Sequence, residues 1–96
     1  MLQNSQYQEE TFGEVDILEQ IDEECHIILY NDEHHSFEYV IDTLVQVCNH
    51  TFEQAEQCAI ITHFKGKCDV KTGSYEYLLP ICTALLDAGL SAQIEE

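Results

Sequence analysis

Basic residues are scarce in this sequence: three lysines and no arginine stand against 19 acids, which gives a formal net charge of −16 over 96 residues. Phosphate backbones repel such a chain, so we expect no nucleic-acid partner. The acidic surface would keep the protein soluble and favour the approach of cationic ligands. All three lysines fall within residues 65–71. They indicate either a solvated turn or a small surface suited to an acidic partner.

Long apolar runs are also missing. No stretch approaches the roughly 20 consecutive apolar residues of a membrane helix, so we expect no membrane association. Residues 1–10 contain no basic residue and no apolar segment of the kind found in secretion signals. These features favour a cytoplasmic protein. The apolar fraction of 45% is that of one globular domain with its own core.

Motifs for catalysis and metal binding are absent as well. The sequence has no triad spacing and no phosphate-binding loop, so we expect neither an enzyme nor a cofactor. The pair His34-His35, next to Asp32 and Glu33, comes nearest to a metal site, and we interpret it as a polar loop.

Five cysteines are present, but none forms a CxxC pair. Without that spacing we expect no zinc site, and without a secretion signal we expect reduced thiols. Three of the cysteines lie on apolar helical faces and are predicted to pack in the core as small hydrophobic residues: Cys48, Cys58 and Cys82.

The chain divides into two parts. Residues 1–24 are acidic and have few apolar positions, which predicts a flexible N-terminal extension. A weak alternation over residues 12–18 leaves open an additional edge strand. Residues 25–96 are expected to form the folded domain.

The folded part begins with a β-branched apolar run over residues 26–30. It closes at Asn31-Asp32, which is typical of a buried strand that ends in a turn. Ser36 is suited to cap a helix. The predicted buried stripe of that helix repeats at three- and four-residue steps: Phe37, Val40, Ile41, Leu44, Val45 and Cys48.

A second helix opens at a capping box, Thr51 to Gln54, and is predicted to end near Gly66. Residues 67–72 are suited to an edge strand. Ser74 can cap a third helix whose stripe would contain Tyr75, Leu78, Leu79, Cys82, Leu85 and Leu86.

Pro80 lies within that third stripe and is expected to kink the helix or to delay its start. Gly89 would end the helix, and residues 90–95 can form a last strand. The order strand, helix, helix, strand, helix, strand predicts an α+β fold, in which a small three-stranded antiparallel sheet packs against three helices.

Three polar residues stand out as a candidate binding site. Asn31 and Asp32 follow the first strand, and His63 lies near the end of the second helix. An amide, an acid and an imidazole can together hold a compact cation that donates three hydrogen bonds, such as a free α-amino group. Simpler interpretations remain open, namely a turn at Asn31-Asp32 and a histidine favoured by the helix dipole.

From His26 to about Glu95 the sequence resembles the ClpS family, whose small adaptors deliver substrates to a Clp AAA+ protease. The order and spacing of several short segments carry the resemblance, although the third helix is several residues shorter here. The segments are Asn31-Asp32-Glu33, Glu38, Val40-Ile41-Asp42, Leu44, Ala55 and His63-x-x-Gly66-Lys67.

The resemblance implies a ClpS-like fold, of the type also seen in the C-terminal domain of ribosomal protein L7/L12. It also implies binding of the N-terminal residue of degradation substrates, the N-degron, which is usually Phe, Leu, Tyr or Trp. Positions that match Asn31, Asp32 and His63 hold the α-amino group, with Glu33 and His35 as secondary positions. The side-chain pocket would be lined by Phe37, Val40, Ala59, Thr62 and Leu90.

The resemblance further implies a monomer that docks on the N-domain of a Clp AAA+ ATPase. Glu76 matches an acid that the family uses for docking, but Ile81 stands where the family has a lysine. The acidic extension resembles the segment that family members feed toward the ATPase pore.

Departures from the family pattern fall mainly in the pocket. His35 stands where threonine is usual, Ser36 where proline is usual, and Thr62 replaces an aliphatic residue. Phe37 and Ala59 each replace a methionine, and the second methionine is thought to exclude β-branched residues. We therefore predict relaxed discrimination against N-terminal Ile and Val. The main alternative is a ClpS-fold module that modulates a Clp ATPase or another partner without binding N-degrons.

Overall fold

The computed structural model describes residues 24–96. The predicted N-terminal extension, apart from Glu24, and the possible strand over residues 12–18 lie outside the described residues. The predicted α+β order is confirmed, since the elements follow one another as β2 (Cys25–Tyr30), α2 (Phe37–Cys48), α3 (Phe52–Lys65), β3 (Lys67–Gly73), α4 (Tyr75–Asp87) and β4 (Ser91–Glu95).

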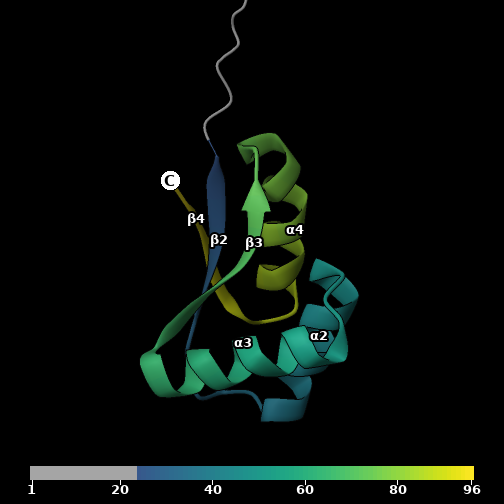
Figure 1. The fold of residues 1–96 in the computed structure, drawn as a ribbon, viewed down its shortest axis with the longest axis vertical. Coiled ribbons are helices and arrows are strands. Elements are labelled where there is room, and N and C mark those ends of the chain that lie inside the picture. Colours follow the sequence, from purple (N-terminus) through teal and green to yellow (C-terminus); the bar gives the residue numbers. More distant parts are fainter. Residues whose placement is uncertain (1–23) are drawn as a thin grey trace, which may run out of the picture.

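The sheet has three strands in the order β3-β2-β4, and β2 is antiparallel to both neighbours. Helix α3 packs against β3, α4 packs against β4, and α2 packs mainly against α3. Figure 1 shows that the end of β2 lies beside the C-terminal end of α3, while α4 runs along the sheet. β3 is at an edge of the sheet, as predicted.

Strand β2 is buried on one side only. Cys25, Ile27 and Leu29 point into the core, and the residues between them are half-buried on the other face. On that outer face His26 Nδ1 lies 2.6 Å from Asp69 Oδ2, and the Tyr30 hydroxyl donates a hydrogen bond to Glu95. The alternation is the usual one for a sheet that helices cover on one face.

The core joins all three helices to the sheet. The three cysteines predicted to be buried are part of it, along with the largest buried side chains. Those side chains are Ile27, Leu29, Leu44, Leu78 and Leu85.

The predicted helix boundaries agree with the structure because the capping residues act locally. Ser36 and Ser74 each accept a hydrogen bond from the backbone amide three residues ahead. Thr51 and Gln54 form the predicted capping box, and α3 ends at Gly66, whose φ of 93° is left-handed. Such a conformation strains residues with a Cβ atom, which explains the glycine there.

Helix α4 departs from the prediction in two ways. It begins at Tyr75 and continues through Pro80, so the proline does not delay its start. The predicted stripe is also too wide, because only Leu78, Cys82 and Leu85 are buried in α4. Leu79 and Leu86 are 45% and 52% exposed. A helix that packs on a small sheet from one side can bury only a narrow stripe.

The three lysines do not lie in a single solvated turn, so that interpretation of residues 65–71 was wrong. Lys65 and Lys67 are exposed, but the Lys71 ammonium donates a 2.8 Å hydrogen bond to the carbonyl of Cys48. This contact and the 2.7 Å contact between His50 Nε2 and the Val70 carbonyl tie β3 to the α2–α3 connection. Among residues 24–96, no helix is both long and apolar enough to cross a membrane.

Candidate functional site

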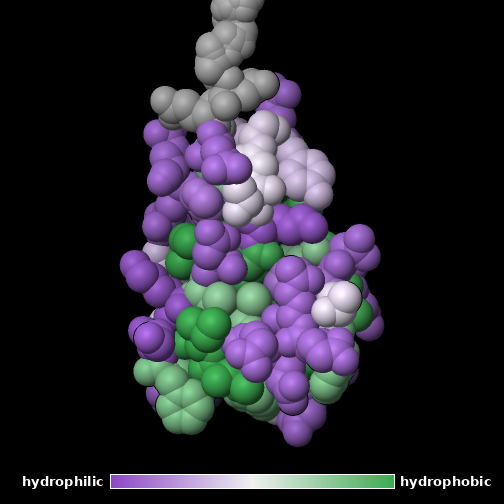
Figure 2. Space-filling model, in the orientation of Figure 1, coloured by the Kyte–Doolittle hydropathy of each residue, from purple (hydrophilic) through white to green (hydrophobic). Residues whose placement is uncertain are grey.

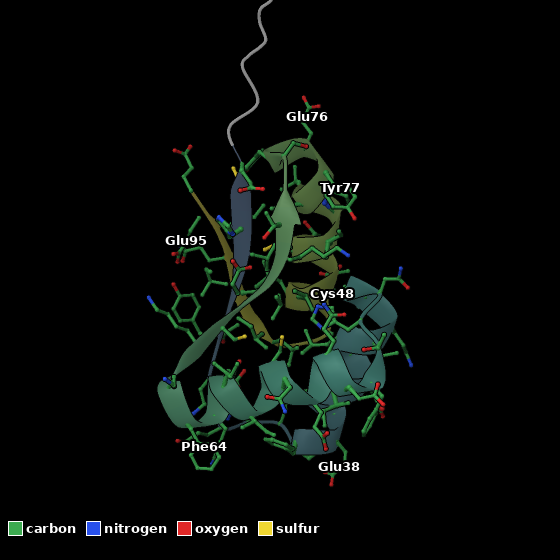
Figure 3. All side chains as sticks on the ribbon, in the orientation of Figure 1. Glu38, Cys48, Phe64, Glu76, Tyr77 and Glu95 are labelled. Atoms are coloured by element: carbon green, nitrogen blue, oxygen red, sulfur yellow. The ribbon has the colours of Figure 1, made fainter. Side chains whose placement is uncertain are left out.

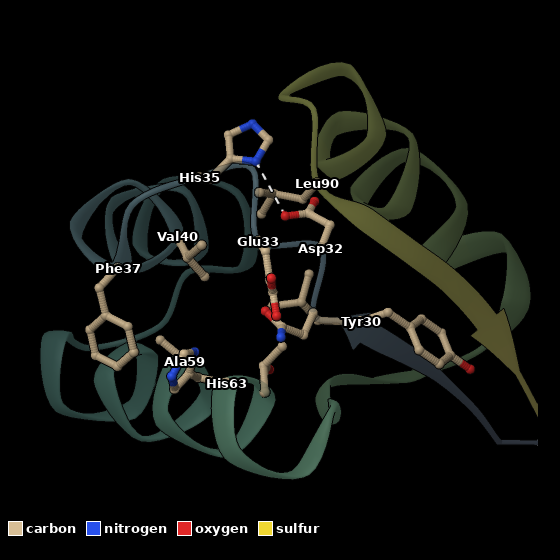
Figure 4. A pocket seen from close by; sticks show the side chains of 12 residues that line it. Tyr30, Asp32, Glu33, His35, Phe37, Val40, Ala59, His63 and Leu90 are labelled. Carbon is tan, nitrogen blue, oxygen red and sulfur yellow. Dashed lines mark ion pairs between the residues drawn. The ribbon is translucent and has the colours of Figure 1, made fainter.

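A pocket of about 500 Å³ opens where β2 ends, between α2, α3 and the start of β4. Figure 4 shows its lining from close by. The structure brings together in it every residue predicted for the amine site, the side-chain pocket and the secondary positions. The full lining is Leu29, Tyr30, Asn31, Asp32, Glu33, His35, Phe37, Val40, Ala59, Thr62, His63 and Leu90.

Glu76 does not line the pocket. It lies in the first turn of α4, at the end of the molecule opposite to Phe64 in Figure 3. A docking role for this residue would therefore use a separate surface. That role stays a prediction.

The two polar segments converge through one backbone contact. The Asn31 amide donates a 3.0 Å hydrogen bond to the carbonyl of Gly66, the C-cap of α3. The end of β2 is therefore fixed beside the last turn of α3, which carries His63. Neither segment reveals this contact in the sequence, since both ends of the hydrogen bond are backbone atoms.

Asp32 is held by groups of its own neighbourhood. Its Oδ1 accepts a 3.0 Å hydrogen bond from the His34 amide, so the turn left open as an interpretation is present. Its Oδ2 accepts a 3.5 Å hydrogen bond from Ser91 Oγ. His35 Nδ1 lies 3.6 Å from Oδ1, just beyond hydrogen-bonding distance.

These contacts keep Asp32 ionised. Burial would raise the pKa of the carboxyl, but the His34 amide and the His35 imidazole outweigh that effect, so the pKa lies below its usual value. The side chain is only partly buried. Asp32 therefore presents a negative charge at the pocket at neutral pH.

Glu33 is a second acid at the pocket, and its contacts differ from those of Asp32. Its backbone has a left-handed φ of 61°, and its side chain projects between the Asp32 side of the pocket and the α3 side that carries His63 (Figure 4). Within the described part of the chain its carboxylate has no hydrogen-bond or ion-pair partner. Of the two acids, Glu33 is thus the one whose oxygens are unoccupied.

His63 stands at the rim between two aromatic rings. Its ring meets those of Phe37 and Phe64 edge to face, with centroid distances of 6.3 and 4.8 Å. Phe64 is 77% exposed. Figure 2 shows apolar surface gathered over α3, at the end of the molecule that carries the pocket. The imidazole nitrogens of His63 have no hydrogen-bond partner among residues 24–96.

The deeper wall of the pocket is apolar. Ala59, Thr62 and Leu90 are each at least 95% buried, Val40 is half-buried, and Phe37 lies at the exposed edge. The Thr62 hydroxyl donates a 2.7 Å hydrogen bond to the Cys58 carbonyl, so its polar group is already paired within α3. A cavity with apolar walls and a few polar groups at one end is suited to a ligand with a polar head and an apolar side chain.

Sequence reasoning missed two lining residues, Leu29 and Tyr30. The sequence feature that could have placed them in the pocket is their position in the strand directly before Asn31. In the described residues, 24–96, no three potential metal ligands gather closely enough to hold an ion. His34 and His35 instead contact Asp32, as members of the polar loop.

Comparison with known proteins identifies the family. The model of the ATP-dependent Clp protease adaptor protein ClpS matches residues 20–93. A search of curated protein sequences finds no match. Among solved structures, that of Agrobacterium tumefaciens ClpS2 bound to L-phenylalaninamide is similar, with a TM-score of 0.69 and 19% sequence identity. The similarity covers 75% of this chain and 94% of that one, and at this identity it shows the shared fold. With most of the folded domain matched, the chain belongs to the ClpS family of Clp protease adaptor proteins.

Proposed function

We propose that this Clp adaptor binds the free N-terminal residue of degradation substrates and delivers them to a Clp AAA+ ATPase in the cytoplasm. The observation that carries the proposal is the composition of the pocket: Asn31, two acids and His63 gather at its mouth, and apolar residues line its depth. An N-terminal residue with a free α-amino group and an apolar side chain matches this pocket, because the amino group can bind the polar mouth and the side chain can fill the apolar depth.

The amino group would bind between the two polar segments. Asn31 offers an amide oxygen and His63 an unpaired ring nitrogen, and both can accept a hydrogen bond from an ammonium group. Asp32 and Glu33 supply the opposite charge. Because Asp32 is engaged with His34 and Ser91, we propose that Glu33 approaches the ammonium more closely and that Asp32 fixes the turn and contributes its charge.

The side chain of the N-terminal residue would enter the apolar part of the pocket. Ala59 lines the pocket on α3, and its side chain ends at Cβ, so this wall extends less far into the pocket than a longer side chain would. Space at this point would accommodate a branch on the ligand's own Cβ atom. We therefore propose that Ile and Val are accepted along with Leu and Phe.

The ligand of the structural neighbour supports the proposal. L-phenylalaninamide, bound to Agrobacterium tumefaciens ClpS2, has a free α-amino group and an aromatic side chain. Delivery would use another surface, and we propose that Glu76 on α4 takes part in docking on the ATPase N-domain. Ile81 would replace a charged contact there by an apolar one.

The proposal is tested with two versions of one peptide. A fluorescent peptide with a free N-terminal Leu should bind, and the same peptide with an acetylated N-terminus should bind at least tenfold more weakly, because acetylation removes the charge. Fluorescence anisotropy measures both affinities. Equal binding of the two peptides would rule out recognition of the amino group. Replacing Glu38, an exposed residue of α2 outside the pocket, gives a matched charge control.

A second candidate function is supported by the internal contacts of the site. The partners of Asp32 and the aromatic neighbours of His63 would account for both residues in a module that regulates a Clp ATPase without binding N-degrons. This module would bind the ATPase but neither version of the peptide. Measuring both interactions with the same protein separates the two functions.

A further inference from the structure

His35 is packed tightly into the side of the pocket. Its ring stacks on that of Tyr39, with centroids 4.9 Å apart and planes inclined by 18°. Tyr39 is itself fixed, because its hydroxyl donates a 2.6 Å hydrogen bond to the carbonyl of Ala88. The imidazole is thus held against α2, whose position is tied to the corner between α4 and β4.

That corner also contacts the imidazole directly. Gly89 has a φ of 91°, and a Cβ atom placed on it would lie 3.0 Å from His35 Nε2. The ring therefore occupies the space that a side chain at position 89 would need. Contacts from two elements fix the ring and determine where its other nitrogen points.

The other nitrogen, Nδ1, faces Asp32. It lies 3.6 Å from Oδ1, is shielded from solvent, and has no hydrogen-bond partner among the described residues. A proton added here would place a positive charge next to the carboxylate and draw the two groups together. When the imidazole is neutral, by contrast, it does not offset the charge of Asp32, and that charge can attract another cation.

We propose that His35 is a positioning residue that makes the capture of a substrate ammonium group depend on pH. The proposal rests on the proposed function. Neutral His35 leaves the charge of Asp32 available to the ammonium, whereas protonated His35 offsets that charge and repels the ligand. Binding and protonation of His35 oppose each other, so peptide binding releases a proton.

Several other groups surround this pair and could titrate or contribute charge. Asp32 and Glu33 lie on the same loop, Tyr39 comes from α2, and His63 lies across the pocket on α3. The corner from Ala88 to Ser91 contributes no ionisable side chain. Asp32 stays ionised in the relevant range, since its pKa lies below the usual value. His34, next to His35 on the loop and able to act on Asp32 through its charge, and His63 are the other histidines near the pair, so the experiment must separate both from His35.

The test compares the affinity for a peptide with a free N-terminal Leu at pH 7.0 and at pH 5.5. For the unmodified protein we expect roughly a fivefold loss at pH 5.5, the effect of two unit charges about 4 Å apart in water. His35→Asn should remove most of this loss, so that the ratio of its affinities at the two pH values approaches one whatever its affinity at pH 7.0. His63→Asn should weaken binding at both pH values and leave the loss due to His35 in place. His34→Asn should leave that loss in place as well, because Asp32 accepts its hydrogen bond from the His34 backbone amide. Thermal unfolding of each variant verifies that it is folded.

Calorimetry in two buffers of different ionisation enthalpy gives an independent readout. At pH 6.5 we expect proton release on binding in the unmodified protein and less release in His35→Asn. A fivefold loss that persists in His35→Asn, or an equal weakening of that variant at both pH values, would overturn the proposal and leave the proposed function intact. Failure of the unmodified protein to bind the peptide at either pH would overturn both.

Discussion

The backbone amide of Asn31 and the carbonyl of Gly66 lie 3.0 Å apart and form a hydrogen bond. The bond joins the end of β2 to the C-cap of α3 across 35 positions of the chain. Asn31, Asp32 and Glu33 on one side and His63 on the other thereby come to line one pocket. The geometry of the candidate site thus depends on how two secondary structure elements end.

The two left-handed glycines should differ in their effect on stability. Gly66→Ala should lower the free energy of unfolding by about 1 kcal/mol, because a Cβ there meets no atom within 4 Å and only backbone strain is added. Gly89→Ala should lower it by about 2–3 kcal/mol, because its Cβ also collides with His35. Urea denaturation measures both values. If Gly66→Ala lowered the free energy of unfolding more than Gly89→Ala does, the result would contradict the packing of His35 against Gly89.

The acids at the pocket should both support binding of a free N-terminus. Asp32→Ala should weaken binding of a Leu peptide by about 2–4 kcal/mol, the range for truncating one partner of a buried charge pair. Glu33→Gln should weaken it as well without disturbing the turn, since Glu33 has no other partner in the described part of the chain. Peptide titrations followed by anisotropy give the affinities. Glu38→Gln serves as the control, and an equal effect of this variant would indicate a nonspecific effect of charge.

The size of residue 59 should determine the side chains that the pocket accepts. The unmodified protein should bind peptides beginning with Ile and Val within about tenfold of those beginning with Leu and Phe. Ala59→Met should weaken binding of Ile and Val peptides by about 1–3 kcal/mol and affect Leu and Phe less, because the added atoms fill the space beside the ligand's Cβ. Competition titrations with the four peptides measure the preference. This prediction would be wrong if the unmodified protein bound the Leu and Phe peptides and failed to bind the Ile and Val peptides.

The thiols of Cys48, which is buried, and Cys68, which is half-buried, should react slowly with thiol reagents in the native state. Burial raises the pKa of Cys48 to about 11, and burial together with Cys58 raises the pKa of Cys68 to about 12. The thiolate is the reactive form, so alkylation at pH 8 should be slow until urea unfolds the protein. The native state holds these protons more tightly than the unfolded state, so stability should fall as pH rises above about 8.5. Mass spectrometry and urea denaturation from pH 7 to 10 measure the two effects.

Neighbouring leucines of α4 should respond very differently to truncation. Leu78 is fully buried, whereas Leu79 is 45% exposed. Leu78→Ala should lower the free energy of unfolding by about 2–5 kcal/mol, and Leu79→Ala by less than about 1 kcal/mol. Thermal or urea unfolding of the two variants provides the measurement. Similar losses would show that the predicted wide stripe, rather than the narrow observed one, is packed.

The sequence could predict the element order and the helix ends because both depend on local chemistry. Capping by Ser36, Thr51 and Ser74 involves backbone amides only three residues away, and Gly66 is required by its own φ. Except for Leu29 and Tyr30, the residues that line the pocket were also predicted, those of the apolar wall through the resemblance to ClpS. The residue types at Asn31, Asp32 and His63 suggested an amine site, but the sequence left a simple turn and a helix-terminal histidine open.

Tertiary structure alone decided which apolar residues are buried, which distant residue contacts Asp32, and where the His35 ring lies. Periodicity gives the direction in which a side chain points, but not the width of the surface that covers it, so Leu79 and Leu86 were assigned to the core of α4 wrongly. The two acids are adjacent and chemically alike. The local turn gives Asp32 the His34 amide as a partner, and packing adds Ser91, which is 59 positions away. Local hydrogen bonds can be read along a chain, whereas contacts between distant segments exist only once the elements pack.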